Sequence, residues 1–253
     1  GIPFMQLTAI IEGSQALRDS DPGTDDISVR IAAYAASVIP DGATLQAGLG
    51  RIPEAVLRGL TGKRDLALHS GLIGDSTLHL LQAGALRADN PITAGVAIGT
   101  RRLYDAVSKP AFCFRPPSFT HDIAVTGQIG NFVTINSAIE VDLTGCAYAE
   151  ATPKGYISGP GGASDFAAGA RGLCGLRIIV MPATAARGTV SKIVVPGSAT
   201  GPISLGRMDT DLVITEHGIA DLRLKSHAAR RAALISIAAP EHQVALTDST
   251  DRN

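Results

Sequence analysis

A carboxylate in an alternating segment is the first candidate for chemistry in this sequence. Between residues 131 and 145, polar and apolar side chains alternate, which is typical of a strand with one oily face. Asn136, Glu140 and Asp142 are therefore expected to point the same way, at the polar end of one continuous strand. A carboxylate there lies either at a solvated sheet edge, which is the more common case, or in a cleft. The segment alone leaves both interpretations open.

A glycine-rich loop at residues 158–166 is the second candidate. Gly161 and Gly162 allow backbone amides to approach a ligand closely. Ser164 or Asp165 is expected to cap a helix that begins there. Such a helix start presents free N–H groups and a positive dipole end, which suits a phosphate group or a developing oxyanion. An ordinary capped loop explains the segment equally well.

Two further turns place polar groups where a strand ends. In residues 46–50, two glycines follow a short strand, but Pro53 stands where a dinucleotide-binding turn has its third glycine, so that fingerprint is weak. In residues 215–223, Glu216 and His217 follow a second strand and are candidate acid/base groups. A strand that feeds a turn and then a helix is expected at both places. Surface residues on ordinary turns remain the alternative.

The elements that must position these groups alternate between strand and helix. Each strand is a short β-rich run bounded by turn residues, and each helix shows apolar residues at helical spacing. Alternation of this kind predicts an α/β fold with an open, largely parallel sheet and flanking helices, in which ligands gather at the carboxyl ends of the strands. Strands are expected at 43–47, 65–69, 92–98, 177–181 and 211–215, and helices at 26–38, 53–60, 75–83, 102–107 and 226–238.

Composition excludes several classes of function. The net charge is −1 and aromatic residues make up 4% of the 253 residues, so nucleic acid is not an expected partner. No run of about 18 apolar residues occurs, so no membrane span is expected. The three cysteines and six histidines lack the spacing of a zinc site or a disulfide framework. We expect no metal, and free thiols in a reducing cytoplasm.

Five segments, in order along the chain, carry a family resemblance. They resemble the C-terminal domain of the acetyl-CoA hydrolase/transferase family, which includes 4-hydroxybutyrate and butyryl CoA-transferases and short-chain acyl-CoA hydrolases. The resemblance implies a domain of the NagB/RpiA/CoA-transferase type. The segments are 40–53, 136–145 (like the nucleophile strand), 161–166 (like the GGxxDF loop), 213–223 (like VTExGxAxLRG) and 235–242 (like the closing helix).

The resemblance implies a mechanism and assigns residues to it. Glu140 becomes the nucleophile that attacks an acyl-CoA thioester, and the backbone amide of Gly218 helps to stabilise the oxyanion. Coenzyme A enters as the substrate carrier, and a small carboxylate accepts it. If water reaches the acyl intermediate, the same site is an acyl-CoA hydrolase. The residues expected to contact CoA are Gln46, Gly48, Asn136, Gly161 and Gly162.

Departures from the family pattern leave other functions open. Lys192 stands where the family commonly has arginine, and Leu224 replaces a glycine. Family members also carry an N-terminal domain, so we interpret residues 1–26 as a linker or N-terminal extension and 27–253 as the C-terminal catalytic domain. The other half of the site is then expected from a separate chain or from self-association. A catalytically silent CoA-binding subunit and a nucleotide-binding Rossmann-type domain are the alternatives to an enzyme.

Overall fold

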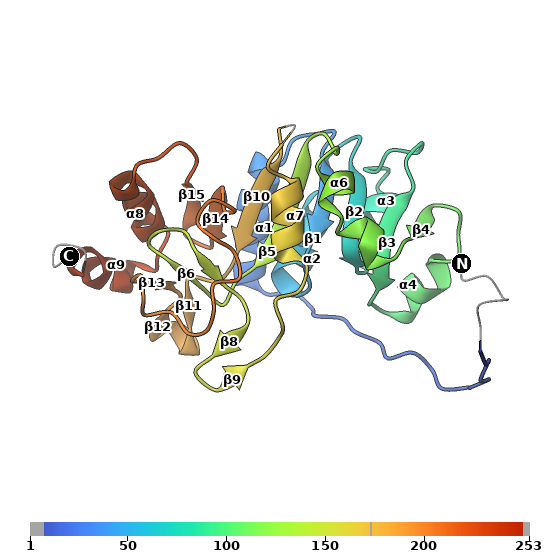
Figure 1. Cartoon of the computed structure of the whole chain (residues 1–253), viewed down its shortest axis with the longest axis horizontal. Coiled ribbons are helices and arrows are strands. Elements are labelled where there is room, and N and C mark those ends of the chain that lie inside the picture. Colours follow the sequence, from blue (N-terminus) through green and yellow to red (C-terminus); the bar gives the residue numbers. More distant parts are fainter. Residues whose placement is uncertain (1–7, 173, 250–253) are drawn as a thin grey trace.

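The computed structural model describes residues 8–172 and 174–249, and among these residues eight strands form one large sheet (Figure 1). The strand order is β15-β14-β10-β5-β1-β2-β3-β4. Every neighbouring pair is parallel except β14 and β15. The predicted α/β fold with an open, largely parallel sheet is confirmed. The strands are β1 Thr44–Ala47, β2 Ala67–Ile73, β3 Ile92–Ala97, β4 Phe112–Phe114, β5 Phe132–Ser137, β10 Leu176–Val180, β14 Leu212–Thr215 and β15 Gly218–Asp221.

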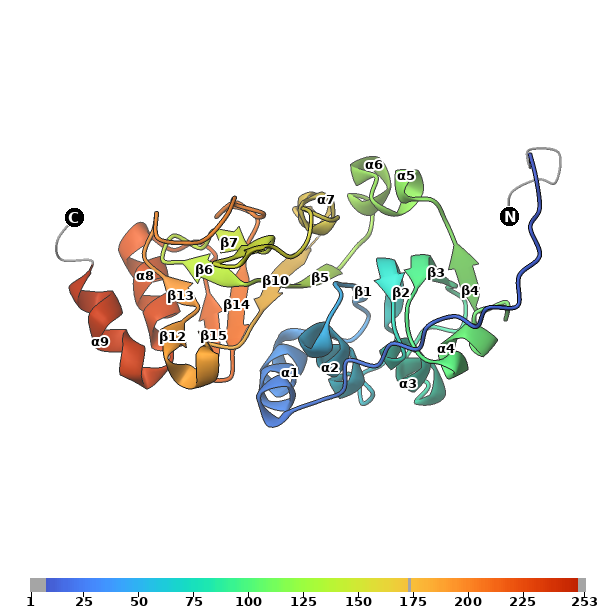
Figure 2. The ribbon, with the colours of Figure 1, turned by 90° about the horizontal axis from the view of Figure 1, so that it is seen from below.

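Helices cover both faces of this sheet, as Figure 2 shows. Four of them lie on one face: α1 Asp26–Val38, α2 Arg51–Gly59, α3 Ser76–Gln82 and α4 Arg101–Ala106. Three helices lie on the other: α5 Pro117–Thr120, α6 Ile123–Thr126 and α7 Ala163–Gly169. Two more extend beyond the β15 edge: α8 His227–Ser236 and α9 Pro240–Asp248. None of the helices within the described ranges is long and apolar enough to cross a membrane.

Smaller sheets lie beside the β10–β14 end of the large one. The most important has three strands in the order β13-β6-β7. Its strands are β6 Glu140–Asp142, β7 Ala147–Tyr148 and β13 Ile193–Val194. The remaining elements are β8 Ala151–Thr152, β9 Gly155–Tyr156, β11 Thr184–Ala185, the 3-10 turn η2 Ala186–Gly188 and β12 Val190–Ser191.

Helix α1 begins where its capping residue predicts. The Asp25 carboxylate accepts a hydrogen bond from the backbone N–H of Ser28 at 2.8 Å, which satisfies one free donor of the first turn. Hydrogen bonds from Ser28 and from Arg51 lower the pKa of Asp25 to about 2. Ile31 and Ala35 face the core, whereas Tyr34 is exposed. Residues 8–25 form neither helix nor strand, and residues 1–7 of the predicted linker lie outside the described residues.

Two separate hydrophobic clusters hold these layers together. The larger lies between the large sheet and helices α1 and α2, and Ile31, Leu45 and Ile135 are among its fully buried members. The second joins the three-stranded sheet to β14, β15 and α8, through residues such as Val141 and Val213. The second cluster therefore couples the three-stranded sheet to the β10–β15 end of the large sheet.

The predicted strand over residues 131–145 is wrong as one continuous element. The chain leaves the large sheet after Ser137 and re-enters β structure at Glu140, in the three-stranded sheet. Period-two alternation persists across this break, so the pattern did not reveal it. Asn136 and Glu140 consequently belong to different sheets. The expected helix after Thr215 is also wrong, because residues 216 and 217 form a turn that leads into the antiparallel strand β15.

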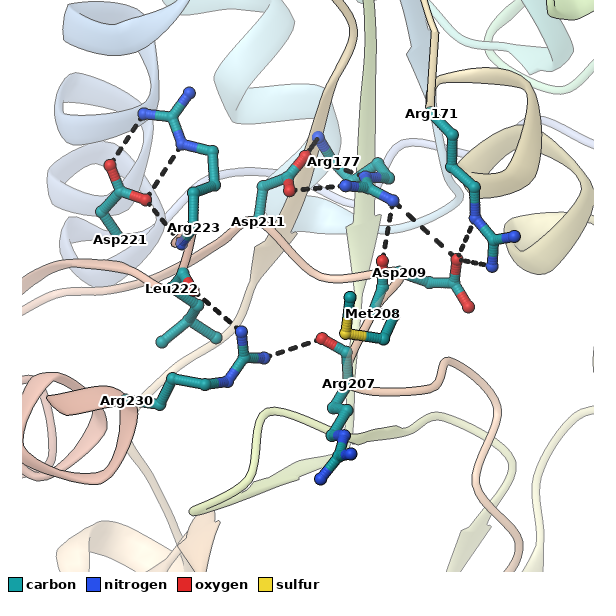
Figure 3. A network of polar contacts seen from close by, with 10 residues as sticks. All are labelled: Arg171, Arg177, Arg207, Met208, Asp209, Asp211, Asp221, Leu222, Arg223 and Arg230. Carbon is teal, nitrogen blue, oxygen red and sulfur yellow. Dashed lines mark hydrogen bonds and ion pairs between the residues drawn. The ribbon is translucent and has the colours of Figure 1, made fainter. Parts of the chain in front are cut away.

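A network of arginines and aspartates ties together the amino ends of β10 and β14 (Figure 3). The guanidinium of Arg177 donates two hydrogen bonds to the Asp211 carboxylate. Nε donates to Oδ2 at 2.8 Å, and Nη2 donates to Oδ1 at 2.7 Å. The backbone N–H of Arg177 donates to the same carboxylate at 2.9 Å. Arg171 pairs with Asp209 at the rim of this network. The pairing joins two core strands at the sheet edge opposite their carboxyl ends.

Candidate functional site

A groove that combines glycine turns with polar groups lies at the carboxyl ends of β1, β2 and β5. Its cavity measures about 590 Å³, within the range of small-molecule sites. Parallel strands that end at one edge leave such a crevice, because the chain turns away from the sheet there. Its lining includes Gln46, Gly48, Leu49, Gly71, His121, Asn136, Ala138, Ile139, Ile157, Gly161, Gly162 and Phe166.

A pair of amides forms the polar floor of this cavity. The side chain of Gln46 donates to Asn136 at 3.2 Å, and Asn136 donates back to Gln46 at 3.0 Å. Both side chains are buried. Each amide still has a second N–H and a second acceptor position for a bound ligand. Gly48 lies against this pair, and a Cβ there would meet the Asn136 oxygen at 2.9 Å.

The imidazole of His121 is wedged between two glycines at the cavity wall. A Cβ on Gly71 would meet the ring at 2.7 Å, and a Cβ on Gly162 would overlap it. The ring also packs on Phe166 with 4.5 Å between centroids. Thr120 Oγ1 lies 2.9 Å from Nδ1 of His121, which fixes that side of the ring. His121 therefore closes the wall between β2 and the start of α7.

The glycine loop reaches the cavity through the start of α7. Gly161 adopts a positive φ of 60°, and Gly162 is the N-cap residue of the helix. No side chain caps this helix, so the predicted capping by Ser164 or Asp165 is wrong. The first-turn amides of α7 are consequently not used by a side-chain cap, which leaves them available to a ligand.

Glu140 stands at the start of β6, directly after two residues of the cavity wall. Ala138 and Ile139 line the cavity, and Glu140 follows them outside the lining. The carboxylate is half-buried and accepts a hydrogen bond from the backbone N–H of Thr200 at 2.7 Å. Tyr148 pairs with Glu140 across β6 and β7. One backbone donor thus holds the carboxylate at the junction of the two sheets.

Asp142 anchors the turn that follows Glu140. Its Oδ1 accepts hydrogen bonds from the N–H groups of Thr144, Gly145 and Cys146. Its Oδ2 accepts from the Tyr148 hydroxyl at 2.8 Å. Burial, followed by this bond to Asp142, raises the pKa of Tyr148. Asp142 therefore holds β6 and β7 in register.

A half-buried lysine and a second carboxylate lie near Glu140. Lys192 donates from Nζ to the carbonyl oxygen of Ala138 at 3.4 Å. Burial lowers the pKa of Lys192 to about 8, although the negative charges of Glu216 and Glu140 act in the opposite direction. Glu216 is buried and accepts from the Ala183 N–H at 2.8 Å. Three charged groups thus meet where the small sheet joins the large one.

Comparison with known proteins identifies the family. The sequence matches the acetyl-CoA hydrolase/transferase C-terminal domain over residues 99–250. The chain belongs to this family. It is 36% identical over 246 residues to the 4-hydroxybutyrate coenzyme A transferase of Clostridium kluyveri, covering 94% of this chain and 57% of that protein. It is 29% identical to the acetyl-CoA hydrolase of Kluyveromyces lactis, covering 83% of this chain and 40% of that protein.

A solved structure supports the same assignment. The 4-hydroxybutyrate CoA-transferase of Porphyromonas gingivalis superposes with a TM-score of 0.85 at 34% identity, covering 98% of this chain and 61% of that one. This acetyl-CoA hydrolase/transferase family chain therefore shares the fold of CoA-transferases over nearly its whole length. It spans about three-fifths of the length of these two transferases.

The structure of this family member brings five of the seven predicted site residues around one cavity. Those five are Gln46, Gly48, Asn136, Gly161 and Gly162. Glu140 lies beyond Ile139, on the three-stranded sheet. Gly218 begins β15 with a φ of 146° and lies outside the cavity lining, two positions after Glu216. The roles of all seven residues stay predictions.

Three residues that contribute to this region of the family chain were not predicted as site residues. His121 follows a pair of prolines and belongs to no motif, so only tertiary packing brings it to the cavity. Thr200 acts through its backbone N–H, which has no side-chain signature. Lys192 stands out in the sequence only as a departure from the family pattern. Its isolation among apolar residues in 190–195 is the one signal that could have indicated burial.

Potential metal ligands and thiols complete the description of the family chain. Within residues 8–172 and 174–249, no group of three or more His, Cys, Asp or Glu side chains is arranged to hold a metal ion. Cys113, Cys146 and Cys174 are free thiols.

Replacing Gly162 with alanine should block the cavity wall. The new Cβ overlaps the His121 ring, so the ring must move, and overpacking of this kind costs about 1–3 kcal/mol. We expect weaker CoA binding by isothermal titration calorimetry and a lower melting temperature. Gly62→Ala is the matched control, because a Cβ there meets nothing within 4 Å and Gly62 lies outside the cavity lining. Equal CoA affinity for the two variants would contradict the assigned wall.

Proposed function

We propose that this chain is the catalytic part of a CoA-transferase that acts on short-chain acyl-CoA through a glutamyl-CoA thioester on Glu140. The observation that carries the proposal is the position of Glu140. Its half-buried carboxylate is held by Thr200 and follows the cavity wall at Ala138 and Ile139. A carboxylate beside a cavity of this size can reach the thioester of a ligand that lies in it.

The proposed reaction proceeds through four displacements. Glu140 attacks the acyl carbonyl, which forms a mixed anhydride and expels CoA thiolate. The thiolate attacks the glutamyl carbonyl, which releases the first carboxylate and leaves the glutamyl-CoA thioester. The acceptor carboxylate attacks this thioester and again expels CoA thiolate. The thiolate finally attacks the acceptor's acyl carbonyl, forming the new acyl-CoA and regenerating Glu140.

The cavity residues have corresponding proposed roles. Gln46 and Asn136 present amide donors and acceptors toward the CoA chain, and Gly48 allows it to approach their floor. Gly161 and Gly162 place the first amides of α7 near a phosphate or an oxyanion. We assign the oxyanion donor to the Gly218 amide on the basis of the family resemblance. Gly218 lies in the same turn region as Glu216, whose charge acts on Lys192 beside Glu140.

Hydrolysis is the second candidate. A family relative at 29% identity is an acetyl-CoA hydrolase, and Glu140 is half-buried rather than sealed from solvent. Water that replaces the acceptor carboxylate discharges the same thioester. Glu140 would then be the nucleophile in both reactions.

We further propose that a second polypeptide or a second copy of this chain completes the site. Leu49 and Ile157 line the cavity, yet each is 66% exposed. Apolar side chains at the mouth of a cavity are typical of a surface that a partner covers. Acyl-CoA and a small carboxylate are the proposed substrates, and the free thiols suit the cytoplasmic location that we propose.

Trapping the intermediate tests the proposed function. The protein is incubated with acetyl-CoA and then treated with hydroxylamine, which converts a glutamyl thioester to a hydroxamate. Mass spectrometry of the peptide that contains Glu140 should show the modification at this residue. Discharge with acetate before hydroxylamine should remove the signal. An unmodified peptide, both with and without candidate partner chains, indicates a catalytically silent CoA-binding subunit and overturns the proposal.

A further inference from the structure

Lys192 is fixed next to Glu140 by its own main chain. It connects β12 to β13, and its N–H donates to the carbonyl of Ala183 at 2.9 Å. Its carbonyl accepts from the N–H of Val141, the residue after Glu140, also at 2.9 Å. Its Nζ reaches back to the Ala138 carbonyl. The amine therefore lies under the break between the cavity wall and Glu140.

The charged groups around this amine are two carboxylates on different elements. Glu140 lies on β6, and Glu216 lies in the turn after β14. Among the described residues, neither makes a direct ion pair with Lys192, yet both act on its charge through space. On the surrounding elements, His217 lies 3.9 Å from Glu216, and Tyr148 on β7 pairs with Glu140. The charge of Lys192 is thus influenced by both carboxylates.

Thioester formation removes one of those two anions. When the Glu140 carboxylate becomes a neutral glutamyl-CoA thioester, the ammonium of Lys192 keeps only Glu216 as a neighbouring negative charge. A buried charge that loses its compensation is unfavourable, so this state favours the arrival of another anion. A carboxylate restores the balance, and water does not.

We propose that Lys192 recruits the acceptor, favouring a carboxylate over water once Glu140 has been converted to the thioester. The inference rests on the function proposed above and extends it to the choice between transfer and hydrolysis. Glu140→Gln provides a neutral, nearly isosteric stand-in for the thioester state. Its use separates the test of Lys192 from the test of the covalent chemistry.

The binding test uses acetate as the probe. Titrations with [¹³C]acetate, followed through the line width of the acetate NMR signal, should show binding to E140Q that is at least about tenfold tighter than binding to the wild type. Adding Lys192→Met to E140Q should abolish this binding, and adding Lys192→Arg should keep it, because the guanidinium retains the charge. Adding Lys109→Met, at an exposed lysine remote from the site, should have no effect. Equal acetate affinity in E140Q and E140Q/K192M overturns the inference.

The pH dependence supplies a second readout. Because Glu140 raises the pKa of Lys192 by its charge, that pKa should fall below about 8 in E140Q. Acetate binding to E140Q should therefore be lost as the pH rises toward 8, whereas binding to E140Q/K192R should persist. A pH-independent affinity in E140Q would show that another group binds the anion.

Protein stability separates this role from a structural one. The pKa of Lys192 lies below its ordinary value of 10.5, so the folded state bears the cost of a buried ammonium below about pH 8. That cost disappears as the pH rises from about 8 to 10.5, where the folded chain has released a proton that the unfolded chain still holds. Lys192→Met removes the ammonium, so its melting temperature at pH 7 should equal or exceed that of the wild type.

The covalent assay then distinguishes the two possible failures. If the thioester forms on Glu140, the rate of its discharge by acetate should fall about tenfold or more in Lys192→Met, while discharge by water should be unchanged. If no thioester forms in the wild type but the acetate results hold, the proposed function fails and the anion site at Lys192 stands. If the thioester forms and acetate discharge is unchanged in Lys192→Met, only the inference about Lys192 fails.

Discussion

Replacing Glu140 with glutamine should lower acetyl-CoA:carboxylate transfer by at least about 10³-fold. The amide has nearly the shape of the carboxylate, and its oxygen can still accept the hydrogen bond from Thr200. It is, however, too weak a nucleophile to open a thioester at a useful rate. The measurement is steady-state transfer from acetyl-CoA to a carboxylate, together with the hydroxylamine trap on the same peptide.

A matched control distinguishes loss of the nucleophile from loss of structure. Glu150 is also half-buried and accepts a hydrogen bond, from Ser204 at 2.9 Å. Glu150→Gln should keep transfer activity, and both variants should melt near the wild-type temperature. If Glu140→Gln retains wild-type turnover, the nucleophile has been assigned to the wrong residue.

Replacing Arg177 with methionine should destabilise the protein by about 3 kcal/mol. Arg177 and Asp211 are both largely buried, with side-chain exposures of 16% and 8%. Removing the arginine leaves the Asp211 carboxylate buried without its charge partner, at the point where β10 and β14 begin side by side (Figure 3). Urea denaturation followed by circular dichroism measures the effect.

The neighbouring pair in Figure 3 offers a control at the surface. Arg171 also pairs with an aspartate, but its side chain is 56% exposed, and exposed pairs contribute about 0–1 kcal/mol. Arg171→Met should therefore change stability by less than about 1 kcal/mol. The double variant Arg177→Met/Asp211→Leu should recover much of the loss, because it removes the unpaired charge. A destabilisation as large in Arg171→Met as in Arg177→Met would contradict this account.

Local patterns predicted most of the large sheet and its helices. Helix α1 has the predicted bounds, because a capping aspartate and a proline-containing turn delimit it. The strands β1, β3, β10 and β14 each begin or end within about two residues of the predicted runs, because short β-rich segments between turn residues have few alternatives. The glycine turn before α2 was predicted for the same reason.

The site was predictable only where chemistry and backbone geometry are local. Gly161 and Gly162 could be proposed as ligand-contacting residues, because a glycine pair before a helix indicates from the sequence alone a place where backbone amides can approach a ligand. The break between Ser137 and Glu140 could not, because alternation of side chains is the same whether a strand stays in one sheet or passes to another. The hairpin after Thr215 was hidden for a similar reason, since a turn residue ends a strand without specifying whether a helix or a second strand comes next. His121 and Lys192 depend on contacts between segments far apart in the chain.

The ring of His121 lies between Gly71 and Gly162. Substitutions at these three positions, which are far apart in the sequence, therefore depend on one another. Any larger residue at either glycine collides with the histidine, so a smaller side chain at position 121 must come first. The order of substitutions is therefore constrained: the same change at position 162 is harmful beside histidine and tolerable beside a small residue. Single substitutions at these two glycines are therefore constrained by the histidine. Variation in substrate preference should accordingly arise first at positions that face the cavity without supporting this ring.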